Sequence, residues 1–190
     1  MLDAALARRL RLVGFDVDGV LTDGGIYLGR VGDHAVELKR FDIQDGLGVK
    51  LLRAAGITVA LVSGRVSEAT ALRAREIGVD ELVQDDGARK LPAFEAILAR
   101  RGFRFDECAF AGDDLADLPL LTRVALPIAV ANGVAEVKAV AGYVTASPGG
   151  SGAVREIAET ILKARGEWDE LVNRYFAERG DVAQRTAGPR

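Results

Sequence analysis

Several residue types that often carry enzyme chemistry are almost missing from this 190-residue chain, which has one histidine, one cysteine, one methionine and one tryptophan. With only His34 and Cys108 to draw on, a histidine-rich zinc site, a Cys/His finger and a disulfide framework are all excluded. A Ser-His-Asp triad would need that one histidine, which lies in a polar turn. Carboxylates, hydroxyls, lysines and backbone amides remain for any chemistry, and aspartate and glutamate together number 28.

A strong charge of one sign and a long apolar run are also lacking. The net charge is −3 and the isoelectric point is near 5.3, so no basic field would draw the chain to nucleic acid or to an anionic membrane. The start of the chain carries an aspartate and three arginines where a signal peptide needs an unbroken apolar stretch. The longest uncharged stretch, residues 139–154, is interrupted by a proline and four glycines. We therefore expect a cytoplasmic protein with no membrane and no nucleic-acid partner.

Short apolar runs alternate with helical patterns along the chain, in which 49% of the residues are hydrophobic. Buried strands are predicted near residues 12–15, 57–62, 81–84, 107–111, 124–130 and 142–145. Helices are predicted near residues 45–55, 67–77, 90–101 and 134–140, and from 152 onward with a helical stripe through 168–176. Strands that alternate with crossover helices predict an α/β fold, a three-layer, Rossmann-like parallel sheet with helices on both faces.

Residues 24–41 break this alternation and predict a β-hairpin. Its apolar side chains are Ile26, Tyr27, Leu28, Val36 and Leu38. An isolated two-stranded ribbon cannot bury that much apolar surface, so we expect it to pack against another copy of the chain. The later motifs follow one another too closely to hold an inserted domain, so the hairpin is expected to act as a flap in place of a cap. One domain is predicted over 1–176, with a mobile tail over 177–190.

Acidic residues follow two of the predicted strands directly. Asp16 and Asp18 come after the first strand, and Asp113 follows the strand near 107–111. One aspartate at a strand end is explained as a turn or helix cap, but capping does not explain a pair together with Asp113 at a second strand end. Because ligands of open parallel sheets bind beyond the carboxyl ends of the strands, these carboxylates are expected to converge. Three carboxylates without a histidine suit a hard, oxygen-seeking ion, and Mg²⁺ is the natural choice.

Two further features are weaker when taken alone. Ser63, Gly64 and Arg65 lie between a predicted strand and a helix, where a hydroxyl and free backbone amides can bind an anion. The same Ser-Gly pair is equally typical of an ordinary turn. Lys90 opens a predicted helix, where a lone lysine is more often simply solvated. Cys108 lies in an apolar strand and is expected to be a small core residue.

Taken together and in this order, these pieces resemble the haloacid dehalogenase superfamily of phosphotransferases. The resemblance rests on the segment 16–21 (Asp-Val-Asp-Gly-Val-Leu), on Ser63, on Lys90 and on the segment 112–117 (Gly-Asp-Asp-Leu-Ala-Asp). It implies that Asp16 attacks phosphorus to form an aspartyl-phosphate, while Asp18 protonates the leaving alcohol and then activates water. Ser63 and Lys90 would hold the transferring phosphoryl oxygens.

The same resemblance implies a metal site. Mg²⁺ would be bound by Asp16, by the backbone carbonyl of Asp18 and by Asp113. The residues expected to support the site are Gly64, Asp114 and Asp117. Phosphoryl transfer depends mainly on alignment and charge neutralisation, so a carboxylate suffices as nucleophile when a divalent cation and a lysine flank it.

Within the superfamily, the hairpin and the segments 41–48, 63–65 and 149–156 are similar to the 3-deoxy-D-manno-octulosonate 8-phosphate phosphatases, capless and tetrameric enzymes of lipopolysaccharide inner-core synthesis. The resemblance spans about residues 10–170 and implies a homotetramer that acts on a sugar-acid phosphate. By position, the substrate contacts of that family fall on Asp18, Asp42, Ile43, Gln44, Asp45, Gly46, Lys50, Arg65, Arg73 and Lys90. Lys50 stands where arginine is usual and Val66 where a polar residue is common, and both positions could set sugar selectivity.

Two alternatives stay open at this point. One is a phosphatase of the same fold for a nine-carbon sialic-type acid phosphate or for another sugar phosphate. The other is a phosphorylatable receiver-type signalling domain, which also uses aspartates, Mg²⁺ and a lysine on a parallel sheet. The order of motifs argues against a receiver, which keeps its acidic pair first and its phosphoacceptor on a later strand. A stable phospho-signal also has no need of a second carboxylate such as Asp18.

Overall fold

The computed structural model describes residues 2–180 as one parallel sheet, a separate hairpin and the surrounding helices. The strands are β1 (Leu12–Phe15), β2 (Tyr27–Val31), β3 (His34–Leu38), β4 (Thr58–Ser63), β5 (Glu81–Gln84), β6 (Cys108–Gly112), β7 (Leu126–Ala129) and β8 (Tyr143–Val144). The helices are α1 (Ala4–Arg9), α2 (Ile43–Ala54), α3 (Glu68–Ile77), α4 (Lys90–Arg101), α5 (Leu118–Leu121), α6 (Ala135–Val140), α7 (Ala153–Arg165) and α8 (Trp168–Arg179). The sheet has the strand order β5-β4-β1-β6-β7-β8, and each neighbouring pair is parallel.

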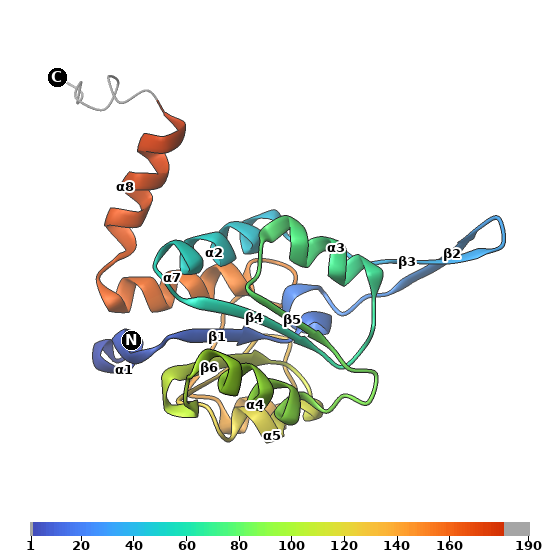
Figure 1. Cartoon of the computed structure of the whole chain (residues 1–190), viewed down its shortest axis with the longest axis horizontal. Helices are drawn as coiled ribbons and strands as arrows, with labels where there is room; N and C mark the ends of the chain where they lie inside the picture. The colour runs from blue at the N-terminus through green and yellow to red at the C-terminus, as the bar shows by residue number, and fades with distance from the viewer. Residues whose placement is uncertain (1, 181–190) are drawn as a thin grey trace.

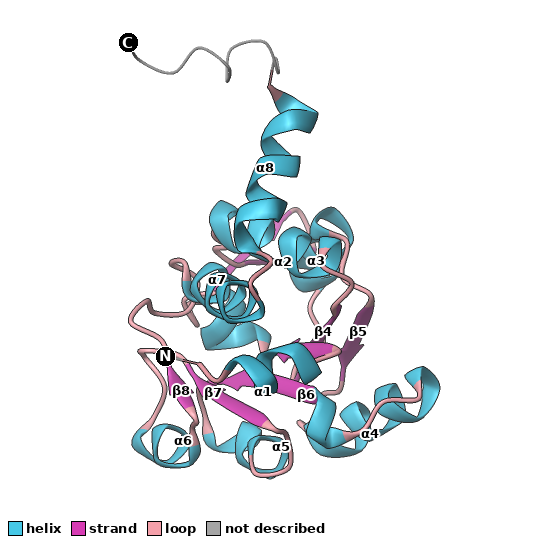
Figure 2. Ribbon diagram, turned by 90° about the vertical axis from the view of Figure 1, so that its left-hand side faces the viewer, coloured by secondary structure: helices cyan, strands magenta, loops and turns pink. Residues whose placement is uncertain are grey.

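The sheet is buried on both faces because successive side chains of each strand point to opposite sides. In β1, Val13 and Phe15 pack into the core shared with α2, α3 and α7, whereas Leu12 packs into the core shared with α4, α5 and α6. Figure 2 shows these two helix layers on either side of the sheet. Because both faces of the sheet are buried, each strand appears in the sequence as a continuous apolar run. The predicted three-layer α/β fold is confirmed.

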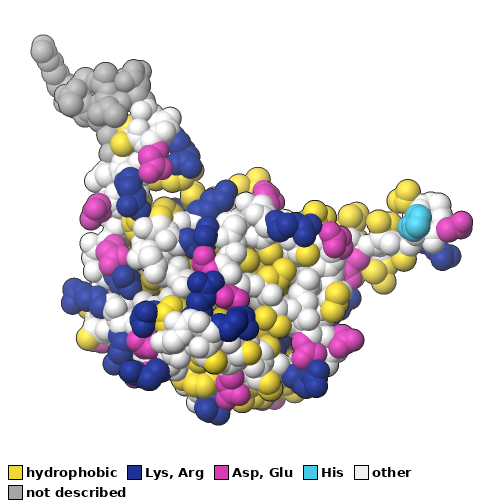
Figure 3. All heavy atoms as spheres, viewed as in Figure 1, with side chains coloured by type: hydrophobic (Ala, Val, Ile, Leu, Met, Phe, Trp, Pro, Cys, Tyr) yellow, Lys and Arg dark blue, Asp and Glu magenta, His cyan; other side chains and the backbone are white. Residues whose placement is uncertain are grey.

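The hairpin of β2 and β3 lies within the predicted range 24–41 and projects from the body of the molecule (Figure 1). Its strands pair antiparallel, from Tyr27 opposite Leu38 to Val31 opposite His34. Apolar side chains lie along the projecting ribbon (Figure 3), and Leu28 is 78% exposed. Within residues 2–180 this ribbon stands in place of an inserted cap domain, so the prediction of a flap is confirmed.

The helices depart from the sequence prediction at both ends of the chain. The pattern did not predict α1, which begins after Asp3, whose side chain accepts the backbone N–H of Leu6 at 2.7 Å. The final helical stretch is two helices, because Gly166, at φ 80°, ends α7 in the left-handed conformation. Helix α8 ends at Arg179, inside the range 177–190 predicted to be a mobile tail, and residues 181–190 lie outside the described residues. None of the helices within 2–180 combines the length and apolar character that a bilayer crossing needs.

Helices α2 and α7 cross at close range. A Cβ added at Gly48 would lie 2.9 Å from Arg155 Cα, so the α2 surface must be flat where the α7 backbone passes. Beside it, the fully buried carboxylate of Asp45 accepts the backbone N–H of Arg155 at 2.8 Å and that of Gly152 at 3.4 Å. Asp45 therefore caps the start of α7 and ties it to α2.

The substitution Gly48→Ala tests this close crossing. The added methyl improves helix propensity but must displace the α7 backbone, and overpacking of this kind costs roughly 1–3 kcal/mol. We expect the Tm, followed by circular dichroism, to fall by about 2–4 °C for each kcal/mol lost. In the control Gly29→Ala the new Cβ would lie 3.9 Å from Val36 Cγ2, which is ordinary van der Waals contact. That variant should lose less than about 0.5 kcal/mol, and an equal Tm for both variants would contradict the close packing of α2 on α7.

Candidate active site

The polar residues predicted at the strand ends meet at one edge of the sheet. Asp16 follows β1, Asp113 follows β6, and Ser63 is the last residue of β4. In the sheet, β1 lies between β4 and β6, so these three positions end neighbouring strands. The backbone N–H of Asp16 donates to the Ala111 carbonyl at 2.9 Å, which continues the pairing of β1 with β6 to the site itself.

Lys90 is buried between two carboxylates rather than solvated. Its Nζ lies 2.7 Å from Asp16 Oδ1 and 2.6 Å from Asp117 Oδ1. Burial lowers the pKa of Lys90, but the charges of Asp16 and Asp117 outweigh burial, so the pKa is raised above its ordinary value. The ammonium therefore stays charged at the centre of the acidic group.

Asp16, Asp113 and Asp117 form a carboxylate cluster in which one oxygen of each lies within 4.8 Å of the others. Burial, followed by the charge of Asp117, raises the pKa of Asp16 well above its ordinary value, and Lys90 offsets part of that rise. The same two causes raise the pKa of Asp113 to about 6. The cluster holds three carboxylates and one ammonium, which pairs with Asp16 and Asp117, and the excess of negative charge favours a bound cation.

The oxygens of the carboxylate cluster are not equally free. Asp117 is fully buried, and its Oδ1 accepts from Lys90 while its Oδ2 accepts the backbone N–H groups of Asp113 and Asp114 at 3.0 and 3.3 Å. Asp113 Oδ1 is buried and has no hydrogen-bond partner among residues 2–180. An orphaned carboxylate oxygen next to Asp16 fits an oxygen-seeking divalent cation. Asp117 instead orients the groups around it.

The turn after β1 is held by a buried threonine hydroxyl. Thr22 Oγ1 donates to the Val17 carbonyl at 3.2 Å and accepts the backbone N–H groups of Gly19 and Gly24 at 3.3 and 3.2 Å. Gly19 has a φ of 96° and lies directly against the Asp113 carboxylate, where a Cβ would overlap it. The two acidic strand ends therefore pack through a glycine backbone.

Two later loops brace the same turn. Asn132 donates from Nδ2 to the Gly19 carbonyl at 2.9 Å, and its Oδ1 accepts the Gly149 N–H at 2.6 Å. The Gly150 N–H donates to the Val20 carbonyl at 3.0 Å. Gly149 and Gly150 run so close to the turn that a Cβ on either would overlap its backbone. The segment 149–156 thus begins with a support for the turn after β1.

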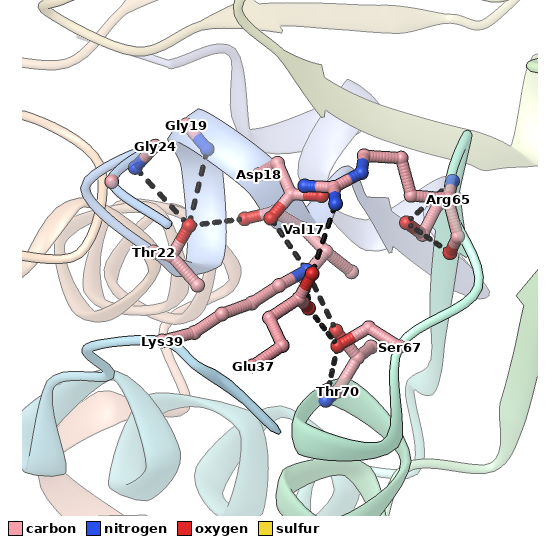
Figure 4. A network of polar contacts seen from close by, with 12 residues as sticks. Val17, Asp18, Gly19, Thr22, Gly24, Glu37, Lys39, Arg65, Ser67 and Thr70 are labelled. Atoms are coloured by element: carbon pink, nitrogen blue, oxygen red, sulfur yellow. Dashed lines mark hydrogen bonds and ion pairs between the residues drawn. The ribbon is translucent and has the colours of Figure 1, made fainter. Parts of the chain in front are cut away.

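Asp18 lies outside the carboxylate cluster and meets a lysine from the end of the hairpin (Figure 4). Lys39, whose side chain is 0% exposed, places Nζ 2.7 Å from Asp18 Oδ1. The same ammonium donates to Thr70 Oγ1 on α3 at 3.3 Å. The aspartate predicted to act as acid and base is therefore paired with a buried cation.

Glu37 completes this contact between the hairpin and α3. Its Oε1 lies 3.6 Å from Lys39 Nζ and accepts the Ser67 hydroxyl at 2.6 Å, and its Oε2 accepts from the Arg65 guanidinium at 2.9 Å. The hydrogen bond from Ser67, then the charges of Lys39 and Arg65, hold the pKa of Glu37 below its ordinary value despite some burial. Arg65, a predicted substrate contact, is thereby anchored at the rim of the site.

Ser63 and Gly64 form a tight turn at the end of β4. Ser63 Oγ is buried, accepts the Arg65 N–H at 3.1 Å and donates to the Arg65 carbonyl at 3.0 Å. A Cβ added at Gly64 would lie 3.0 Å from the Cβ of Ala88, which has a φ of 52°. These are the hydrogen bonds of an ordinary turn, so phosphate binding by Ser63 stays a prediction.

The start of α2 carries several of the predicted substrate contacts. Asp42 caps the helix by accepting the Gln44 N–H at 2.7 Å, and its carbonyl accepts from Arg73 at 2.7 Å. Ile43 and Gln44 are exposed. Arg73 is nearly buried and also pairs with Glu76 at 2.9 Å, so the protein itself uses this guanidinium to hold the start of α2.

Three other predicted contacts lie deeper in the fold or farther along α2. Asp45 is buried as the cap of α7, and Gly46 lies beneath Arg73, where a Cβ would be 2.6 Å from the guanidinium. Lys50 is exposed and lines a groove of about 260 Å³ between α2 and α8 together with Tyr175. The structure thus brings Asp18 and Arg65 into one network but does not place Asp45 or Lys50 with them.

The isolated histidine and cysteine have no place in this site. Cys108 is buried in β6, and burial, followed by the charges of two neighbouring acids, raises the pKa of its thiol to about 12. His34 is an exposed residue at the start of β3. The prediction of a core cysteine is confirmed, and the polar turn predicted around His34 is the exposed tip of the hairpin.

Sequence reasoning missed four residues of the site, namely Glu37, Lys39, Thr22 and Asn132. Glu37 and Lys39 alternate with Val36 and Leu38, so their period of two already indicates that the two charged side chains point to the same side of the strand. Asn132 follows β7 much as Asp113 follows β6, and a search of strand ends that included amides would have found it. Thr22 carried no sequence signal.

A protein-family model described as haloacid dehalogenase-like hydrolase matches residues 81–157. The 3-deoxy-D-manno-octulosonate 8-phosphate phosphatase KdsC of Escherichia coli (strain K12) is 39% identical over 166 residues, which cover 87% of this chain and 86% of that protein. KdsC of Yersinia pestis is 40% identical over 159 residues, which cover 84% of this chain and 83% of that protein.

Solved structures agree with these relatives. The 3-deoxy-D-manno-octulosonate 8-phosphate phosphatase of Moraxella catarrhalis, crystallised with a magnesium ion, a phosphate ion and KDO, superposes with a TM-score of 0.84 at 37% identity, over 90% of this chain and 97% of that one. The enzyme of the same name from Yersinia pestis has a TM-score of 0.82 at 38% identity, over 87% of this chain and 88% of that one. By sequence identity, coverage and fold, the chain belongs to the haloacid dehalogenase-like hydrolases, in the family of 3-deoxy-D-manno-octulosonate 8-phosphate phosphatases.

Proposed function

We propose that this protein is a Mg²⁺-dependent phosphomonoester hydrolase that releases phosphate from 3-deoxy-D-manno-octulosonate 8-phosphate through an aspartyl-phosphate on Asp16. The observation that carries the proposal is the buried pairing of Asp16 with Lys90 beside Asp113, in a chain 39% identical to a phosphatase of that substrate. Its product would then enter lipopolysaccharide inner-core synthesis, as the sequence resemblance implies.

The first step transfers the phosphoryl group to the protein. One carboxylate oxygen of Asp16 forms a bond to phosphorus while the bond from phosphorus to the alcohol oxygen of the substrate breaks. Asp18, in its neutral form, gives its proton to the departing oxygen. Lys90 holds Asp16 in line, and Ser63 with the backbone amides after β4 holds the phosphoryl oxygens.

The second step returns Asp16 to its starting state. Asp18, now a carboxylate, takes a proton from a water molecule whose oxygen attacks phosphorus. The bond from phosphorus to the Asp16 oxygen breaks, inorganic phosphate leaves, and the proton on Asp18 serves the next cycle. One aspartate thus acts first as acid and then as base, which is how a chain with a single histidine performs both tasks.

The metal site is proposed on Asp16, Asp113 and the backbone carbonyl of Asp18, supported by Asp114 and Asp117. The orphaned Oδ1 of Asp113 and the excess of carboxylates over cations support this assignment. When bound, Mg²⁺ supplies positive charge that neutralises the phosphoryl oxygens and the attacking carboxylate.

The eight-carbon sugar acid is favoured because relatives named for that substrate match most of this chain. We propose that Arg65 and the start of α2 meet its carboxylate and hydroxyls. A nine-carbon sugar acid is the second candidate, because Lys50 lacks the bidentate fork of an arginine and Val66, 68% exposed next to Arg65, presents no hydrogen bond. A receiver-type signalling domain loses its support, since the chain belongs to a family of hydrolases.

We also propose that residues 1–176 form one domain that assembles as a homotetramer through the hairpin, in the cytoplasm. The exposed apolar side chains of the ribbon support the assembly, with Tyr27 59%, Leu28 78% and Leu38 64% exposed. Such a surface on a two-stranded ribbon is typical of a subunit contact.

Asp16→Asn should abolish hydrolysis while the fold is retained. The amide is a poor nucleophile of nearly the same size, so phosphate release from the sugar-acid phosphate should fall by at least about 10⁴-fold. Release is measured with a phosphate assay and the fold by circular dichroism. Asp169→Asn, an exposed change on α8, is the matched control and should keep wild-type rates. A wild-type rate for Asp16→Asn would show that the proposed mechanism is wrong.

Removal of divalent cations should stop the reaction on every substrate. Phosphate release from a panel of eight-carbon and nine-carbon sugar-acid phosphates and hexose phosphates is compared with Mg²⁺ and with EDTA. Activity should be highest on the eight-carbon acid and should return on addition of Mg²⁺. Equal rates on hexose phosphates would reject the narrow substrate, whereas full activity in EDTA would reject the metal site.

The hairpin should set the oligomeric state. The single change Leu28→Glu places a charge on the most exposed apolar side chain that the ribbon presents, and it should convert a tetramer into smaller species. Light scattering measures the mass of wild type and variant at micromolar concentration. Glu136→Gln, on α6 away from the hairpin, is the control. A stable wild-type monomer would contradict the assembly.

A further inference from the structure

Lys39 has a buried side chain, and the reaction steps proposed above give it no role. Its side chain is 0% exposed, and it follows the last residue of β3. Lysines are rarely fully buried unless they are paired, because removing an ammonium from water costs far more than its aliphatic stem gains. A lysine buried this way indicates that its partners need the charge.

The partners of Lys39 come from three different parts of the fold. Its Nζ lies 2.7 Å from Asp18 Oδ1 in the turn after β1, 3.3 Å from Thr70 Oγ1 on α3 and 3.6 Å from Glu37 Oε1 on β3. The contact with Thr70 is a hydrogen bond, and the contacts with Asp18 and Glu37 are ion pairs, so the ammonium lies between two carboxylates. Figure 4 shows the ammonium between the Asp18 and Glu37 carboxylates.

Further contacts fix the position of the Lys39 ammonium. Glu37 accepts the Ser67 hydroxyl at 2.6 Å and the Arg65 guanidinium at 2.9 Å, so its carboxylate cannot follow Lys39 if the lysine moves. Ser67 is in turn the N-cap of α3 and is nearly buried. These contacts fix the position of the Lys39 ammonium, and Asp18 forms its ion pair with that fixed group.

We propose that Lys39 is a positioning residue that holds the carboxylate of Asp18 by Oδ1 and thereby presents Oδ2 to the reacting oxygens. The inference deepens the proposed function and rests on the acid and base roles given there to Asp18. A free aspartate rotates about two side-chain bonds, and a displacement of about 1 Å at a proton-transfer group can cost on the order of 10²-fold in rate. Lys39 removes that freedom.

The hairpin therefore has a part in the chemistry. Glu37 and Lys39 lie on one face because they alternate along the same extended segment, while the apolar Val36 and Leu38 occupy the other. The side chains of Glu37 and Lys39 reach α3 and Asp18, whereas Val36, Leu38 and Leu28, which pairs opposite Glu37, stay exposed. The hairpin is too small to cover the site, but it places Lys39 in contact with Asp18.

Lys39→Met removes the ammonium and keeps the length of the side chain. The test compares kcat/KM for two substrates, the sugar-acid phosphate and p-nitrophenyl phosphate. An alkoxide must be protonated as it leaves, whereas p-nitrophenolate leaves without an acid, and kcat/KM on the aryl ester reports only steps up to its release. We expect kcat/KM to fall on the order of 10²-fold for the sugar-acid phosphate and by less than about 3-fold for the aryl ester.

The second step gives an independent readout. Loss of a positioned base slows hydrolysis of the aspartyl-phosphate, so Lys39→Met should release about one equivalent of p-nitrophenol per site in a burst and then turn over slowly. Lys163→Met, an exposed lysine on α7, is the matched control and should behave as wild type. Thr70→Val, which removes only a neutral acceptor of Lys39, should shift the ratio of the two kcat/KM values in the same direction by a smaller factor.

The outcomes separate this inference from the proposed function. If Lys39→Met lowers kcat/KM equally for both substrates, or raises KM for the sugar-acid phosphate without lowering kcat, Lys39 binds substrate or supports the fold and the inference is overturned. If Lys39→Met does not fold, an unchanged ratio in Thr70→Val overturns it as well. If wild type releases no phosphate from either substrate, the proposed function fails instead.

Discussion

The buried ammonium of Lys90 is the interaction on which the site depends. Asp16 and Asp117 are both nearly or fully buried, and each lies within 2.7 Å of that one nitrogen. Two carboxylates could not be taken from water at such close range without a cation between them. Because Lys90 is the first residue of α4, this pairing also fixes how α4 meets the ends of β1 and β6.

One lysine does not balance three carboxylates, and the rest of the site follows from that imbalance. Lys90 and backbone N–H groups satisfy both oxygens of Asp117, whereas burial and the charge of Asp117 raise the pKa values of Asp16 and Asp113. Asp18 lies outside the carboxylate cluster and pairs with a second cation, Lys39. The site therefore keeps its acidic groups in two places, with Asp16, Asp113 and Asp117 gathered in one cluster and Asp18 paired with its own cation.

The fold could be predicted because it follows from local sequence patterns. The contacts within the site could not be predicted in this way. Continuous apolar runs mark strands buried on both faces, and Gly78, at φ 74°, ends α3 where the sequence predicts. The contact of Asn132 with Gly19 joins segments far apart in the chain, and no periodicity encodes a partner of that kind. Asp45 was predicted to contact the substrate, but it caps the distant helix α7. The sequence alone does not distinguish a carboxylate with that structural role from one that binds a ligand.

The pairing register of the hairpin decides which of its side chains reaches the site. Its strand period of two puts Lys39 on the face of Asp18 and Leu38 on the opposite, exposed face. A slip of one residue in the pairing of β2 with β3 would exchange those faces, bury Leu38 against a carboxylate and leave the ammonium in solvent. The turn that sets the register contains Gly32, whose φ of 60° suits a tight hairpin connection. A glycine at the far tip of the flap thus helps to determine which side chain reaches Asp18.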